Sequence, residues 1–224
     1  MKTLTSPVSL NDDVTPNNPL FYQLVTDIFE QGYSIQPAAL PASLSLALQQ
    51  HQHRMDQSLF NDAGIGRGDD HMQNSFVRTD EICWINGDSA AGRQWLAWAE
   101  SLRLFLNQQL MLGLFSFESH FAHYRPGDYY KRHQDAFVGE ANRVLSVVVY
   151  LNSGWGHGDG GELVLYRDEA DQTGIRVTPL LGTLVVFQSE GFPHEVLPSG
   201  KDRYSVAGWF RLNTTHAGRL DPPR

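Results

Sequence analysis

Residues 144–152 read VLSVVVYLN, a run of β-branched, aliphatic and aromatic residues that favours a β-strand. Three further runs of this kind follow along the chain: ELVLY (162–166), TLVVF (183–187) and RYSVAGWFRLN (203–213). Ahead of them, the period of two places Phe115, Phe117 and Phe121 on one side of a further strand. The second half of the chain is therefore predicted to consist of strands.

The segments between these runs indicate how the strands are arranged. The Gly-rich stretch SGWGHGDGG and the loops around Pro193 and Pro198 separate the runs at a spacing typical of a sandwich or barrel. The first half is mostly helical in pattern, with helices expected from Leu20 to Gly32, from Pro41 to about Ser58 and from Ser89 onward, and with a short strand at EICWI (81–85). The sequence predicts a mainly β fold: a double-sheet barrel buttressed by N-terminal α-helices.

Length and composition limit the classes of protein. We expect one domain over residues 19–213, with a loosely ordered N-terminus (1–18) and a C-terminal tail (214–224). No apolar run approaches the roughly 20 residues that span a bilayer, and the N-terminus lacks the apolar stretch of a secretory signal. Because Cys83 is the single cysteine, an internal disulfide is excluded and a cytoplasmic location is expected. A net charge of −8 without clustered Lys and Arg argues against a nucleic-acid surface.

The stretch YYKRHQDAF (129–137) carries His133 and Asp135 two positions apart. In a strand, residues two apart project to the same face, so both could bind one ion, although two exposed polar residues are the simpler alternative. His194, in EGFPHEVLP, is the candidate third ligand. Two histidines and one carboxylate leave three positions of an octahedral ion open, which is typical of non-haem Fe(II) oxygenases.

An open iron site needs a co-substrate. 2-Oxoglutarate can chelate iron at one end, and its far carboxylate then requires a fixed cation. Arg203 follows His194 by nine residues and is placed to return on the adjoining strand with its planar guanidinium. An ordinary surface salt bridge is the alternative interpretation of this arginine.

Several motifs now stand in one order along the chain: His133-x-Asp135, NRVLSVVVYLNSGW (142–155), GGELVLY (160–166), His194 and Arg203. This pattern resembles the prolyl 4-hydroxylase branch of the Fe(II)/2-oxoglutarate dioxygenases. It looks closest to the oxygen-sensing prolyl hydroxylases of animals and to their bacterial relatives that act on elongation factor Tu. The resemblance covers about residues 64–212, and it implies a double-stranded β-helix (jelly-roll) core over 113–213 with helical support over 19–112.

The resemblance also implies roles for single residues. His133, Asp135 and His194 would hold Fe(II), and no catalytic residue beyond these metal ligands is implied. Arg203 would pair with the far carboxylate of 2-oxoglutarate. Tyr150 matches the tyrosine whose hydroxyl supports that carboxylate in relatives, with a plain barrel-core aromatic as the alternative.

Further positions match with less direct roles. Tyr124 of HYRPGDYY matches a tyrosine that reaches toward the metal-bound end of the co-substrate, although this stretch is one residue shorter than in the animal enzymes. Trp209 matches a tryptophan near the target residue, or it packs in the core. Asp80 of FVRTDEICWING matches an acidic residue that pairs with an arginine at the position of Arg143, unless both are exposed charges. Ala207 stands where animal relatives carry a threonine beside the co-substrate.

The family's activity is hydroxylation at C4 of a proline in a protein, with succinate and CO2 released and with ascorbate as a reductant. A long loop before residue 80, together with Arg143 and Trp209, suits an extended peptide, and elongation factor Tu is the leading candidate by resemblance. Hydroxylation of a free amino acid or other small molecule, and a non-catalytic cupin-like metal-binding barrel, stay open as alternatives. The other histidines are interpreted as surface or core polar residues: His51, His53, His71, His120, His123, His157 and His216.

Overall fold

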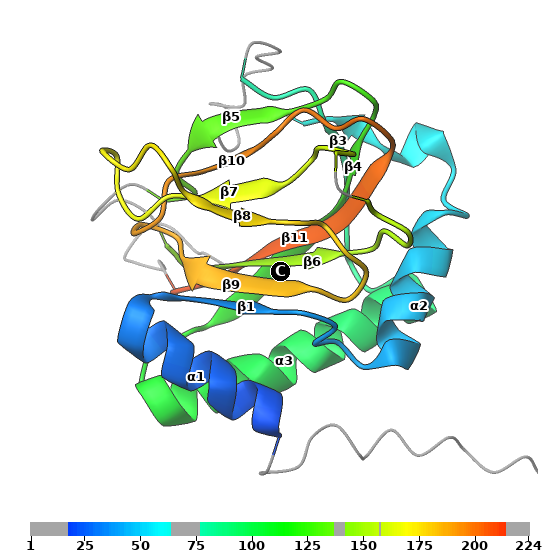
Figure 1. Cartoon of the computed structure of the whole chain (residues 1–224). Coiled ribbons are helices and arrows are strands. Elements are labelled where there is room, and N and C mark those ends of the chain that lie inside the picture. The colour runs from blue at the N-terminus through cyan, green and yellow to red at the C-terminus, as the bar shows by residue number, and fades with distance from the viewer. Residues whose placement is uncertain (1–17, 64–76, 137–141, 157, 214–224) are drawn as a thin grey trace, which may run out of the picture.

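The computed structural model describes residues 18–63, 77–136, 142–156 and 158–213 (Figure 1). They form the α-helices α1 (Pro19–Gln31), α2 (Ala42–Gln52) and α3 (Ala90–Leu110) and a short 3-10 helix, η1 (Gln57–Leu59). The strands are β1 (Tyr33–Gln36), β2 (Asn61–Asp62), β3 (Glu81–Trp84), β4 (Ser116–Tyr124), β5 (Tyr130–His133), β6 (Arg143–Tyr150), β7 (Leu163–Leu165), β8 (Ile175–Val177), β9 (Leu184–Gln188), β10 (His194–Val196) and β11 (Arg203–Arg211). Apart from Asn18, the expected loose N-terminus and the expected tail lie outside these residues. No helix in the described ranges is long and apolar enough to cross a membrane.

Capping residues mark the start and end of α1 and the start of α3. The Asn18 carboxamide accepts a hydrogen bond from the first turn of α1, and Gly32 ends that helix at a φ of 82°, a left-handed conformation that glycine adopts without strain. Ser89 caps α3 in the same way, as predicted. The predicted helix over 41–58 is too long, because the Asp56 carboxylate caps a new 3-10 turn after α2 has ended.

Two antiparallel sheets face each other. The larger sheet has the order β1-β9-β6-β11-β4-β3-β2, and the smaller one has the order β5-β10-β7-β8. Figure 1 shows α1 and α3 along one side of the larger sheet, with the smaller sheet on the opposite side. This arrangement confirms the mainly β jelly-roll core with helical support.

Each face of the larger sheet has its own hydrophobic core. The outer core holds the helices and includes Trp95 and Phe121, whereas Ala122 and Tyr124 belong to the inner core between the sheets. Trp95 is fully buried, and replacing it by alanine is expected to destabilise the fold by about 3–5 kcal/mol. Because residues two apart on a strand share a face, His120 points inward with Ala122 and Tyr124. The inner face of the larger sheet is where the candidate site lies.

Candidate active site

The three predicted ligand residues converge between the sheets. His133 ends β5 and His194 begins β10, and the two are opposite residues on these paired strands. Asp135 lies just after β5, where the chain bends. Its carboxylate oxygens are 3.7 Å from Nε2 of His133 and 3.6 Å from Nε2 of His194. One ligand atom from each residue lies within 4.8 Å of the others, and no second group of this kind occurs in the described ranges.

Hydrogen bonds orient both imidazole rings toward this centre. Nδ1 of His133 donates to the carbonyl oxygen of Lys131 at 2.9 Å, and Nδ1 of His194 donates to that of Phe192 at 3.1 Å. Since a carbonyl oxygen only accepts, Nδ1 carries the hydrogen in each ring and Nε2 keeps its lone pair for a metal. Burial and the neighbouring His133 lower the pKa of His194 to about 4, so its imidazole is neutral near pH 7.

The carboxylate of Asp135 is ionised and fixed in orientation. Burial alone would raise its pKa, but the two histidines and Arg143 hold the pKa well below its usual range. The Ser146 hydroxyl donates to one carboxylate oxygen at 2.6 Å, and the Ser189 hydroxyl lies 2.9 Å from that of Ser146. Two imidazole nitrogens and one carboxylate on one side of a centre are the donor set that Fe(II) accepts with positions left open.

Arg203, the first residue of β11, is buried with 1% of its surface exposed. Its Nε donates to the Gly161 carbonyl oxygen at 2.8 Å, and Nη1 lies 3.3 Å from the Ser205 hydroxyl. Among the described residues no carboxylate lies within ion-pair distance of this guanidinium. A buried charge without a counter-ion is strongly unfavourable, so the position fits an anionic ligand such as the far carboxylate of 2-oxoglutarate.

Two tyrosines flank this guanidinium. The ring centroids of Tyr124 and Tyr150 lie 4.7 and 5.1 Å from the central carbon of Arg203. The Tyr150 hydroxyl is buried and has no hydrogen-bond partner in the described part of the chain. Burial, opposed by Arg203, raises the pKa of Tyr150 to about 12, so the hydroxyl stays protonated and can donate. The structure thus places all three predicted co-substrate residues at one end of the inner face.

The resemblance implied an ion pair between Asp80 and Arg143, with two exposed charges as the alternative, and neither arrangement is present: Asp80 is buried and each residue pairs with another group. Asp80 pairs instead with Arg78 at 2.7 Å. Arg143 pairs with Glu118 at 3.0 Å. Strand register explains the difference: the start of β3 pairs with the end of β4, whereas Arg143 lies across β11 from the start of β4. At about 3.3 Å per residue, these two positions, His123 and Ser116 on β4, lie about 23 Å apart.

The same two arginines lie against aromatic rings at the edge of the site. The Arg143 guanidinium lies 3.6 Å from the ring centroid of Trp209, which brings two predicted substrate residues together. The Arg78 guanidinium lies 4.3 Å from the ring of Tyr130, and that ring stacks on His133 with centroids 3.5 Å apart. An aromatic and cationic wall therefore borders the candidate metal centre.

Sequence reasoning missed several of these residues, although a signal existed for some of them. Arg78 lies two positions before Asp80, the spacing that places both on one face of an extended segment. Glu118 shares the inward face of β4 with Tyr124. The contact of Ser146 with Asp135 has no signal in the sequence, because the two residues lie eleven positions apart and meet only in the folded chain.

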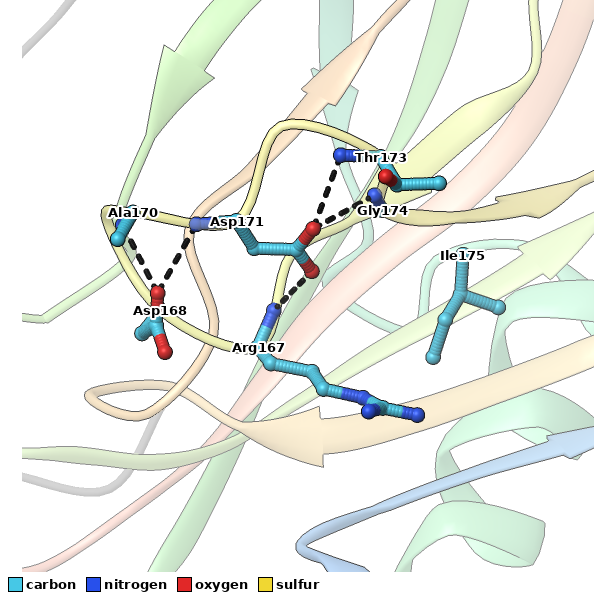
Figure 2. Close-up of a pocket in the computed structure, with 7 residues that line it drawn as sticks. All are labelled: Arg167, Asp168, Ala170, Asp171, Thr173, Gly174 and Ile175. Atoms are coloured by element: carbon cyan, nitrogen blue, oxygen red, sulfur yellow. Dashed lines mark hydrogen bonds between the residues drawn. The ribbon is translucent and has the colours of Figure 1, made fainter.

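A separate hollow of about 500 Å³ lies on the loop between β7 and β8 (Figure 2). Its lining is Arg167, Asp168, Ala170, Asp171, Thr173, Gly174 and Ile175. The Asp171 carboxylate accepts hydrogen bonds from three backbone N–H groups of the loop, and Asp168 accepts two more. Because both acidic groups already stabilise the turn, the hollow is not a candidate site.

Comparison with known proteins agrees with this geometry. Residues 119–211 match the 2OG-Fe(II) oxygenase superfamily. The chain is similar to a prolyl-4-hydroxylase of Pseudomonas putida, with 41% identity, a TM-score of 0.77, and 87% of this chain and 100% of that chain covered. It is also similar to a prolyl hydroxylase of Trichoplax adhaerens, solved in complex with a peptide fragment of the hypoxia inducible factor oxygen degradation domain. There the identity is 26% and the TM-score 0.76, over 90% and 91% of the two chains.

A viral collagen prolyl hydroxylase from Paramecium bursaria Chlorella virus-1, solved as a 2OG complex, shares the fold at 19% identity. Its TM-score is 0.58, over 82% of this chain and 98% of that chain. The likeness to the Pseudomonas putida enzyme extends over most of both chains at an identity that shows common family. The chain therefore belongs to the prolyl hydroxylase family of the 2OG-Fe(II) oxygenase superfamily, and it is a dioxygenase that uses Fe(II), 2-oxoglutarate and O2.

Proposed function

We propose that this enzyme hydroxylates C4 of a proline in a protein substrate. The observation that carries the proposal is the juxtaposition, inside one barrel, of the triad and a buried arginine that has no carboxylate partner among the described residues. His133, Asp135 and His194 are the proposed Fe(II) ligands. The cofactor pair, when bound, supplies the oxidising chemistry that converts a C–H bond into C–OH, with 2-oxoglutarate and O2 converted into succinate and CO2.

The chain's own residues have two tasks in this proposal. Arg203 and the Tyr150 hydroxyl hold the far carboxylate of 2-oxoglutarate, and the Tyr124 ring closes the other side of the guanidinium. Ser146 keeps the Asp135 carboxylate in one orientation. No side chain needs to act as a general acid or base, so these residues act by binding and orientation.

The wall beside the triad supports a peptide as the substrate. Trp209 under Arg143 and Tyr130 under Arg78 offer flat aromatic and cationic surfaces, which suit a proline-containing segment. The Trichoplax adhaerens relative was solved with a peptide, which favours the same class. Elongation factor Tu is the first protein to test, on the resemblance alone. We place the reaction in the cytoplasm, where the thiol of the lone cysteine would stay reduced.

The test is reconstitution of the enzyme with Fe(II) and 2-oxoglutarate without oxygen, followed by O2 and elongation factor Tu or a cytosolic extract. Succinate release and proline residues that gain one oxygen atom, located by peptide mass mapping, are the readouts. Asp135→Ala is the inactive variant, and Asp88→Ala, an exposed aspartate in the turn before α3, is the matched control. We expect a modified proline with the wild-type enzyme and with Asp88→Ala, and none with Asp135→Ala.

Other outcomes point to other functions. Succinate production without any modified protein would favour a small molecule as the substrate. Metal binding without consumption of 2-oxoglutarate would contradict an enzymatic role and favour a binding barrel.

A further inference from the structure

His120 faces inward on β4, and the proposed function gives it no role. His120 lies opposite Trp84 of β3 on one side and Ala207 of β11 on the other, in the row that crosses the inner face of the large sheet. Its ring centroid is 5.2 Å from that of Trp84 and 5.4 Å from that of Trp209. Trp84 is 50% exposed, so this row opens to solvent at β3. His120 thus lies between two tryptophans at the open edge of the site.

Two buried polar atoms at this position have no hydrogen-bond partner among the described residues. His120 is 3% exposed, and its Nδ1 is buried without a hydrogen bond to any residue that the structure describes. Nε1 of Trp209 is likewise buried without an acceptor in the described ranges. A buried polar group left unpaired costs about 1–3 kcal/mol, so two of them side by side need a reason. The Tyr150 hydroxyl, at the co-substrate end, is another buried atom of this kind in the described ranges, and there the carboxylate of 2-oxoglutarate is the proposed partner.

The chemistry of these atoms limits the ligand. Burial, together with Arg78 and Arg143, lowers the pKa of His120 to about 3, so the imidazole is neutral and offers one N–H donor and one acceptor nitrogen. Nε1 of Trp209 can only donate. A ligand that pairs with both the imidazole N–H and the indole N–H must supply two acceptors. A peptide at an X-Pro bond meets this requirement, because the tertiary amide presents carbonyl oxygens and no N–H.

The position of His120 separates it from the co-substrate. Arg203 lies opposite Tyr124 on β4, and His120 lies four residues before Tyr124 on the same face. At about 3.3 Å per residue, the two backbone positions are about 13 Å apart. His120 is thus at the Trp209 end of the inner face and Arg203 is at the opposite end.

We propose that His120 is a specificity-determining residue that, together with Nε1 of Trp209, donates hydrogen bonds to main-chain carbonyl oxygens of the substrate segment around the target proline. This inference rests on the proposed function and adds to it the group that recognises the prolyl main chain.

The experiment compares His120→Leu, His120→Asn and a matched control, His53→Leu, which makes the same change at an exposed position after α2. The leucine variant removes both nitrogens, whereas asparagine keeps a donor close to the position of Nδ1. The substrate is elongation factor Tu if the wild-type enzyme modifies it. Otherwise it is a synthetic peptide that spans the proline identified by mass mapping of the cytosolic extract. Peptide binding is measured calorimetrically with Mn(II) in place of Fe(II). The KM for 2-oxoglutarate and the thermal midpoint are measured on the same samples.

We expect His120→Leu to lower kcat/KM for the prolyl substrate and its binding constant by about 10- to 100-fold, the loss of one buried hydrogen bond. Asparagine is expected to restore much of this loss, and His53→Leu to behave as wild type. Because leucine removes unpaired polar atoms from a buried position, the thermal midpoint of His120→Leu should be equal to or above that of the wild type.

Three results would overturn the inference. The first is unchanged peptide binding in His120→Leu. The second is a higher KM for 2-oxoglutarate in that variant with unchanged peptide binding. The third is a lower thermal midpoint, which would explain the reduced activity and peptide binding of the variant by misfolding. A wild-type enzyme that modifies no proline in any protein is a different failure. It would remove the proposed function itself, and it is recognised before any variant is compared.

Discussion

Replacing Gly161 by alanine is the sharpest test of the co-substrate pocket. Gly161 has a φ of +69°, and a Cβ built on it would lie 3.0 Å from Cδ of Arg203 and 3.1 Å from the Ser199 hydroxyl oxygen. Its carbonyl oxygen also accepts the hydrogen bond from Nε of the same arginine. The added methyl group must therefore push the arginine or the backbone that holds it. It would also bring the cost of a left-handed alanine, about 1–2 kcal/mol.

Gly154 provides the matched control. Its φ is +65°, close to that of Gly161, but a Cβ there meets nothing within 4 Å. Gly154→Ala therefore brings the same backbone strain without the contact with Arg203. Both variants should lose about 1–2 kcal/mol of unfolding free energy for the left-handed conformation, with a further loss in Gly161→Ala from crowding.

The two variants should differ in their affinity for 2-oxoglutarate. Displacing Arg203 by a few tenths of an ångström weakens its charge-assisted hydrogen bonds, which are worth about 1.5–3 kcal/mol each. We expect the KM for 2-oxoglutarate in Gly161→Ala to rise by about tenfold, corresponding to about 1.4 kcal/mol. The assay is succinate release against 2-oxoglutarate concentration, with urea unfolding of the same samples. Equal KM values for Gly161→Ala and Gly154→Ala would refute the assignment of Arg203 as the anchor.

Three further predictions test other parts of the site. Ser146→Ala should weaken metal binding by about 10- to 100-fold, because Asp135 loses the donor that orients it; titration with Mn(II) measures this. Arg203→Lys should raise the KM for 2-oxoglutarate while some activity remains, because lysine keeps the charge and loses the planar pair of donors; steady-state succinate release measures this. Acid should destabilise the fold through His120, whose pKa falls from 6.5 in the unfolded chain to about 3 in the folded one. Because the unfolded chain binds the proton first, the free energy of unfolding falls as the pH drops from 6.5 toward 3, by up to about 1.4 kcal/mol per pH unit. Urea unfolding at pH 7 and pH 5 measures this loss, which should be smaller in His120→Leu than in the wild type.

The parts of the fold that follow local rules could be predicted from the sequence. Runs of β-branched residues such as 144–152 mark strands wherever they lie in a chain, and Ser89 or Gly32 mark a helix end through contacts within a few residues. The end of α2 could not be predicted, because the competing cap at Asp56 restarts a turn within a sequence that still permits a helix.

Within the site, the sequence indicated residues whose chemistry limits what they can do. His133, Asp135 and His194 were named from their ligand atoms and from a family resemblance, and the structure groups them. The role of Arg203 toward 2-oxoglutarate stays a prediction. The partners of Asp80 and Arg143 were not found, because they depend on the register of strands joined by long connections. A shift of one residue in that register would change every cross-strand pair.

The two ends of the inner face offer different polar groups to a ligand. Along β4 and β11, Arg203 and the Tyr150 hydroxyl lie at one end, and His120 and Trp209 lie toward the other. The first pair combines a permanent charge with a hydroxyl donor, which suits a carboxylate. The second pair consists of neutral donors, which suit amide carbonyl oxygens and would bind a carboxylate poorly. Since the triad lies between the sheets over the same face, this difference in charge would direct each ligand to its own end, without a wall between them.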